Sequence, residues 1–239
     1  TGIVSPFIFE LGEALGRNTL VGRGTVANMT YKQVLQDTMD WFSYGQVEPS
    51  QGVYRGGWRY TDNYSTSDNS TAQWGSLPTL YGKAWGLTVP NYVKNELSLW
   101  TTYIQNKDND WRFGGSGYDH PSGGGAEVSI SKTGGLMLEF GVEGLPLSDQ
   151  RVKDALTFMQ STVGFDHWNQ GPSGWSGNLG QPYAMWAVYK ALQYYGVDFI
   201  STAPGNIPIG QDWDPKTSLA GDWFAQYQDW IVTHQNMNG

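Results

Sequence analysis

Apolar residues recur along the chain at the spacing of helices, and no segment shows the continuous alternation of a β-strand. The segment 147–160 is typical of an amphipathic helix, with one apolar face and charged residues opposite it. The residues of this apolar face are Val152, Ala155, Leu156 and Met159. The segment 181–195 differs, since nearly all of its positions are apolar or small and Pro182 stands near its start, where proline is tolerated. The first pattern predicts a helix on the outside of the fold, and the second predicts a helix buried on most sides.

Two sequence markers alternate four times along the chain. One is a glycine that closes an apolar run, and the other is a glutamine near the end of the amphipathic run that follows. The glycines are Gly16, Gly86, Gly144 and Gly196, and the glutamines are Gln46, Gln105, Gln160 and Gln235. Because glycine readily adopts the left-handed conformation that ends a helix, each unit is predicted to be a helical hairpin. The hairpins are predicted over about 1–48, 66–108, 124–163 and 178–237.

Loops rich in glycine and aromatic residues separate these hairpins. The apolar first helices require burial on nearly all sides, whereas the amphipathic second helices require one face in solvent. We therefore expect an all-α fold of two layers, an α/α toroid or an open arc, formed by a single repeat domain over 1–239. A generic helical bundle is the alternative.

The loop after each second helix resembles the QW motif of the squalene–hopene cyclase and protein prenyltransferase class, the α/α-toroid repeat. Trp100, Gln105, Asn109 and Trp111 fit its order of aromatic residue, Gln, Gly and Trp, with Asn in the Gly position. The segment 68–74 also looks like the start of an inner helix in such repeats. The resemblance implies a structural role for the glutamines: each amide would cap N–H groups at a neighbouring helix start while the Trp ring covers it.

Closed toroids of this class usually have five to seven hairpins, and four are predicted here. We therefore expect either a fragment of a larger chain or an open arc that pairs with another copy. The catalytic groups of the class are missing. The chain has no Cys and no Asp-x-Asp-Asp run, so the zinc site of the prenyltransferases and the proton donor of the cyclases are absent. No metal and no cofactor are expected.

Composition narrows the functional classes further. The chain has 12 Trp and 32 Gly, a net charge of −8 and only 14 scattered Lys and Arg, so a nucleic-acid partner is not expected. No apolar run is long enough for a membrane span. The low Lys content and acidic balance are typical of secreted or cell-surface proteins. Asn28, Asn63 and Asn69 stand in glycosylation sequons, at a frequency close to chance.

Two similar loops each pair Asp with His and continue into Pro-Ser-Gly. Asp119 and His120 follow Tyr118 in the first loop, and Asp166, His167 and Trp168 form the core of the second. A histidine general base with a nearby tyrosine would suit proton abstraction beside a carboxylate, as in a polysaccharide lyase. His120, His167 and Tyr118 are therefore weak catalytic candidates. The alternative is that each Asp accepts the His N–H and fixes its loop, and an acidic protein attracts polyuronates poorly.

Aromatic rings in the Gly-rich loops suit neutral sugars, whose C–H faces stack on such rings. The expected ligand-binding residues are Trp58, Trp111, Asp119, His120, Asp166, His167, Trp168 and Trp175. The same tryptophans could instead hold one repeat against the next. The sequence thus predicts a non-catalytic secreted or cell-surface domain that binds a glycan or a protein, or that joins a homo- or hetero-assembly. A polysaccharide lyase or a terpene cyclase-like enzyme on the same scaffold is the alternative.

Overall fold

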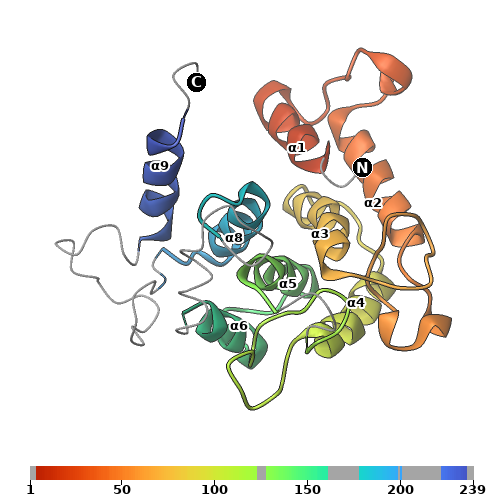
Figure 1. Cartoon of the computed structure of the whole chain (residues 1–239). Helices are drawn as coiled ribbons and strands as arrows, with labels where there is room; N and C mark the ends of the chain where they lie inside the picture. Colours follow the sequence, from red (N-terminus) through yellow and green to blue (C-terminus); the bar gives the residue numbers. More distant parts are fainter. Residues whose placement is uncertain (1–3, 123–127, 161–177, 199, 201–221, 236–239) are drawn as a thin grey trace. The chain divides into compact units, whose positions relative to one another are not determined.

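The computed structural model describes residues 4–122, 128–160, 178–198, 200 and 222–235. Regular structure in these ranges is helical, with isolated β-bridges and no strand, which confirms the all-α prediction for the described part. The chain divides into two compact units, Thr1–Thr102 and Tyr103–Gly239, which are described one at a time. Figure 1 labels the helices.

The first unit is formed by three helices that pack on one another and by most of a fourth. They are α1 (Val4–Leu15), α2 (Tyr31–Tyr44), α3 (Asn69–Ala84) and α4 (Asn91–Ile104), with short 3-10 helices at Gly24–Val26 and Pro49–Tyr54. Ile8, Leu35 and Trp85 are buried together between α1, α2 and the end of α3. Gly12 lies so close to Trp85 that a Cβ there would overlap the indole ring. Glycine at this position therefore allows α1 to pack directly against the Trp85 ring at the end of α3.

The second unit contains α5 (Ile130–Glu143), α6 (Gln150–Gln160), α8 (Pro182–Tyr195) and α9 (Trp223–Thr233). Every residue of α5 from Ile130 to Val142 is buried, so α5 is the most enclosed helix described. It packs against α8 along its length: Gly134 lies against Ala187, and the Tyr194 hydroxyl donates to the Gly141 carbonyl over 3.0 Å. Because both contacts advance in the same direction along the two helices, α5 and α8 are parallel.

The predicted glycines end the first helix of each hairpin in the left-handed region, with φ of 99° at Gly16, 68° at Gly86, 86° at Gly144 and 62° at Gly196. The residue that follows Gly86, Gly144 or Gly196 donates its N–H back to a carbonyl of the final helical turn. These bonds join Leu87 to Gly82, Leu145 to Phe140 and Val197 to Leu192 over 2.9–3.0 Å. This is the Schellman arrangement, which satisfies carbonyls that a helix end leaves unpaired. The prediction of left-handed glycine ends is confirmed.

None of the helices in the described ranges combines the length and the apolar character that a membrane crossing requires.

Candidate functional site

Gln46 and Gln105 form matching pairs of hydrogen bonds, each inside its own unit. The Gln46 side-chain nitrogen donates to the Gly56 carbonyl over 2.7 Å and to the Val93 carbonyl over 3.0 Å. The Gln105 nitrogen donates to the Gly114 and Arg151 carbonyls over 3.0 and 2.9 Å. In both cases one carbonyl belongs to the following loop and the other to the first turn of the next amphipathic helix. Each glutamine therefore ties its loop to that helix.

The polarity of these bonds is the reverse of the predicted one. Capping N–H groups would use the amide oxygen as an acceptor, but here the amide nitrogen donates to two carbonyls. The loop glycines Gly56 and Gly114 have φ of 86° and 83° and lie directly against the helix. A Cβ at either glycine would overlap a helix carbonyl, that of Glu96 or that of Asp154, so only glycine fits.

The other two predicted glutamines stand next to segments that lie outside the described residues. Gln160 is buried, and its nitrogen donates to the Leu156 carbonyl of its own helix over 3.4 Å. The loop that follows it, residues 161–177, lies outside the described residues. Gln235 is exposed at the end of α9, and residues 236–239 are also outside the described ranges.

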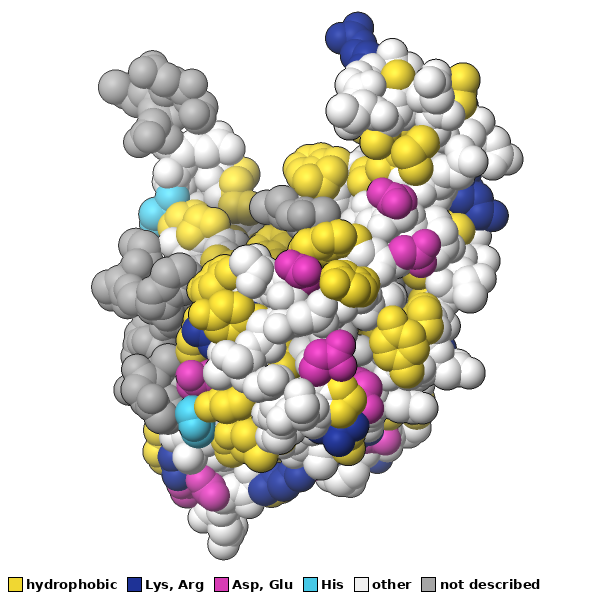
Figure 2. Space-filling model, turned by 90° about the vertical axis from the view of Figure 1, so that its right-hand side faces the viewer, with side chains coloured by type: hydrophobic (Ala, Val, Ile, Leu, Met, Phe, Trp, Pro, Cys, Tyr) yellow, Lys and Arg dark blue, Asp and Glu magenta, His cyan; other side chains and the backbone are white. Residues whose placement is uncertain are grey.

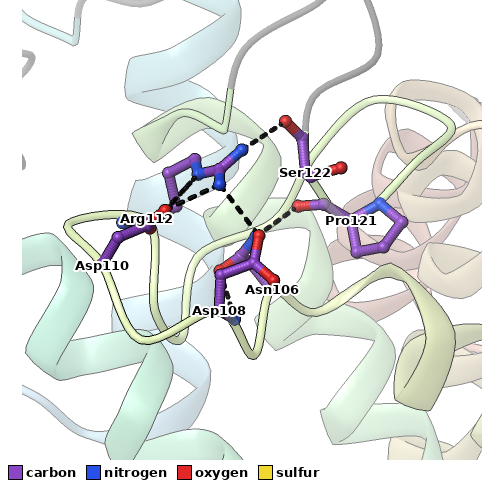
Figure 3. Close-up of polar contacts among 6 residues, drawn as sticks. All are labelled: Asn106, Asp108, Asp110, Arg112, Pro121 and Ser122. Atoms are coloured by element: carbon purple, nitrogen blue, oxygen red, sulfur yellow. Dashed lines mark hydrogen bonds and ion pairs between the residues drawn. The ribbon is translucent and has the colours of Figure 1, made fainter.

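A polar network closes the loop 106–122 in the second unit (Figure 3). The Arg112 guanidinium donates to Asp110 over 2.6 Å and to Asp108 over 2.9 Å. It also donates to the Ser122 carbonyl over 2.8 Å, while the Asn106 amide donates to Asp108 over 3.1 Å. Asn106 also donates to the carbonyl of Pro121 over 2.9 Å, so the network joins the start of the loop to its end.

This network shapes the charges of the loop. The side-chain hydrogen bond from Arg112, followed by the Arg112 backbone N–H, lowers the pKa of Asp110 below its usual value. The same bond raises the pKa of Arg112. Asn106, Asp108 and Asp110 are residue types that a hard cation prefers, but here the cation that pairs with Asp108 and Asp110 is the Arg112 guanidinium. The described ranges contain no group of three or more His, Cys, Asp or Glu that could hold a metal ion.

Two aromatic residues flank Arg112 and are half-exposed: Trp111 is 47% exposed and Phe113 is 43% exposed. Exposed hydrophobic side chains are widespread on the described surface (Figure 2), so exposure alone does not mark a site. This pair lies on a loop whose start and end are joined by side-chain hydrogen bonds.

The predicted Tyr-Asp-His set lies in this same loop. Tyr118 and Asp119 are half-buried and His120 is exposed. The His120 Nδ1 and the Asp119 Oδ1 are 2.9 Å apart, the pairing that sequence reasoning offered as the structural alternative for this Asp-His loop. The second loop of this kind, with Asp166, His167, Trp168 and Trp175, lies outside the described residues.

Trp58 lies in the interior of the first unit. It is only 2% exposed, its indole N–H donates to the Phe42 carbonyl over 2.8 Å, and its ring lies against Gly75. The structure therefore gives Trp58 a packing role, and no ring face is open to a ligand.

Phe113 and Arg112 were not singled out by the sequence analysis. The spacing of Asp108 and Arg112, four residues apart with Asp110 between them, was the available signal for a paired cation. Nothing local indicated that Phe113 would be exposed.

Comparisons of the chain with models of known families, with curated proteins and with solved structures found no match.

Proposed function

We propose that the chain is a non-catalytic, all-helical repeat domain of a secreted or cell-surface protein, and that its loop 106–122 binds a neutral glycan. The observation that carries the proposal is the pair of half-exposed rings, Trp111 and Phe113, on a loop whose central cation is already paired. Aromatic rings stack on the C–H faces of sugars, and polar groups beside them take the hydroxyls.

The electrostatics of the loop favour a neutral ligand over a charged one. Arg112 is paired with Asp108 and Asp110, so an incoming carboxylate would have to displace Asp110, whose two carboxylate oxygens both accept from the guanidinium. Asp119 and the net charge of −8 further disfavour an anionic polysaccharide. The closed network also orders the loop before a ligand binds. Less conformational entropy of the loop is therefore lost on binding.

We further propose that the helical hairpins form a repeat array of the α/α-toroid kind. The proposal is supported by the matching bonds of Gln46 and Gln105, by the left-handed glycines that end the first helices, and by the parallel packing of α5 and α8. In a repeat array each unit contacts its neighbours, and its loops fall on one side where a ligand can bind.

The proposal is tested by screening the whole chain against neutral and acidic glycans, followed by calorimetric titration of the best ligand. Trp111→Ala and Phe113→Ala should each lower the affinity by about twofold to twelvefold, the effect of losing one aromatic contact of about 0.5–1.5 kcal/mol. Trp41→Ala is the matched control, since Trp41 is a similarly exposed tryptophan on α2. Absence of glycan binding, or equal effects of all three substitutions, would contradict the proposal.

The 2.9 Å pairing of Asp119 with His120 favours one second candidate, a polysaccharide lyase in which His120 is the base. Incubation with polyuronates and detection of unsaturated products by ultraviolet absorbance tests it. Product formation that His120→Ala abolishes, while the variant still binds the polyuronate, would establish the enzyme in place of a non-catalytic domain.

A further inference from the structure

The first unit contains a loop that begins in the same way as the loop 106–122 of the second unit. This loop, residues 47–67, joins α2 to α3 (Figure 1). In both loops the first residue exchanges two backbone hydrogen bonds with a Gly-Gly pair, and these bonds are 2.8–2.9 Å long. The residues are Val47 with Gly56 and Gly57 in the first unit, and Asn106 with Gly114 and Gly115 in the second.

Both loops also end alike. The N-cap residue of the following helix donates its backbone N–H over 3.2 Å to the carbonyl of the residue after the glycine pair. These pairs are Asp68 with Trp58 and Ser129 with Ser116. Because the preceding glutamines are bound in the same way too, the two loops share one backbone frame, and their side chains decide what each can bind.

An exposed ring in the loop 47–67 is oriented by an ion-paired arginine. The guanidinium carbon of Arg59 lies 5.6 Å from the centroid of the Tyr60 ring. Arg59 is itself fixed, since its Nε lies 3.1 Å from the carboxylate of Asp68, which is fully buried and caps α3. Tyr60 is nevertheless 71% exposed. The ring therefore has a fixed underside and is accessible to a ligand.

A second exposed tyrosine, Tyr64, follows a turn that is tied to the end of α2. Asn63 in this turn has a positive φ of 47°, a conformation that Asn adopts more readily than most residues. Its N–H donates to the Gly45 carbonyl over 3.2 Å. Tyr64 comes directly after Asn63 and is 44% exposed. Like the loop 106–122, this loop presents two aromatic rings on a backbone that hydrogen bonds hold in place.

The charges of this loop favour a neutral ligand. Both of its arginines are already ion-paired, Arg59 as described and Arg55 with Glu96, whose two oxygens accept from the guanidinium over 2.7 Å. The other charged residues of the loop, Glu48 and Asp62, are acidic and exposed. An anionic ligand would have to displace a carboxylate from an arginine, whereas sugar hydroxyls can donate to the exposed carboxylates.

We propose that the loop 47–67 is a second site for a neutral glycan, with Tyr60 as its stacking ring and Tyr64 as a further contact. The inference rests on the proposed function of the loop 106–122, because the shared frame extends that function to the first unit. The C–H face of a sugar would stack on Tyr60, and the neighbouring Asp62 would accept from its hydroxyls. The chain then carries two sugar sites, one in each unit.

The test is a titration of the ¹⁵N-labelled whole chain with a short neutral oligosaccharide, the best ligand of the glycan screen, followed by amide chemical shifts. These shifts report the two loops separately, and both loops should respond. Tyr60→Ala should weaken binding at the loop 47–67 by about twofold to twelvefold and leave the loop 106–122 unchanged. Tyr60→Phe keeps the ring and should bind like the unaltered chain. Phe7→Ala is the matched control, at an aromatic residue of α1 that is 65% exposed, and should leave both loops unchanged.

The outcomes separate this inference from the function on which it rests. A response of the loop 106–122 alone, or equal effects of Tyr60→Ala and Phe7→Ala, would overturn the second site and leave the first in place. A response of the loop 47–67 alone would support the site at Tyr60 and overturn the one at Trp111 and Phe113. No response in either loop would overturn both.

Discussion

The hydrogen bonds of Gln46 can be removed with little change in side-chain size by Gln46→Leu. The substitution deletes the bonds to Gly56 and Val93, which are 2.7 and 3.0 Å long and buried. A typical buried hydrogen bond contributes about 0.5–1.5 kcal/mol to stability, so two bonds correspond to about 1–3 kcal/mol. The Gln46 amide oxygen is itself buried without a hydrogen-bond partner, which destabilises the folded state. Removing this oxygen therefore offsets part of the stability lost with the two bonds. We expect a net loss of about 1–2 kcal/mol in the free energy of unfolding.

Urea unfolding followed by tryptophan fluorescence measures this loss. Because the chain divides into two units, the transition of the first unit should shift, and that of the second should not if the two are resolved. Gln235→Leu is the control: Gln235 occupies the same sequence position in the last hairpin but is exposed, so its loss should be within about 0.5 kcal/mol of zero. If Gln46→Leu is as mild as Gln235→Leu, the bonds do not hold the loop to the helix and the reasoning is refuted.

Three further predictions follow from the described contacts. Gly114→Ala should lower the free energy of unfolding by more than about 2 kcal/mol, since φ is 83° and the new Cβ would overlap a backbone carbonyl of α6. The control is Gly24→Ala, where φ is 68° and a Cβ would meet open space. This control should lower the melting temperature clearly less than Gly114→Ala does. Arg112 lowers the pKa of Asp110, so the ion pair stabilises the folded loop at pH values above the unfolded pKa of Asp110 near 3.8. This stabilisation is lost as the pH falls through the lower pKa of the folded state. The fluorescence of Trp111 should change over that pH range, and Asp110→Asn should abolish the change. In a glycosylating host, mass spectrometry should find glycan at exposed Asn28 and none at Asn69, which is fully buried; modified Asn69 would contradict the structure of α3.

Local features of the fold were predictable because they depend on residues within one helical turn of each other. The periodicity of 147–160 predicted an amphipathic helix, and α6 occupies that segment. Gly144 and Gly196 predicted left-handed helix ends, because the backbone conformation at a C-cap follows from the absence of a Cβ. The candidate loop with Trp111 and His120 was also identified from its composition, and the structure places these residues in one loop that its own side chains close.

Contacts between distant residues decided the rest. Gln46 and Val93 are 47 positions apart, and no local pattern states that the amide donates to a carbonyl there. Trp58 and Trp111 look alike in sequence, yet one is buried against Gly75 and the other is half-exposed. The apolar pattern of α1 predicts a helix but not which of its apolar side chains lie in solvent. The sequence by itself determined the helices and their ends through short-range backbone preferences, whereas burial, hydrogen-bond direction and free surfaces required the tertiary structure, because they depend on which distant segments meet.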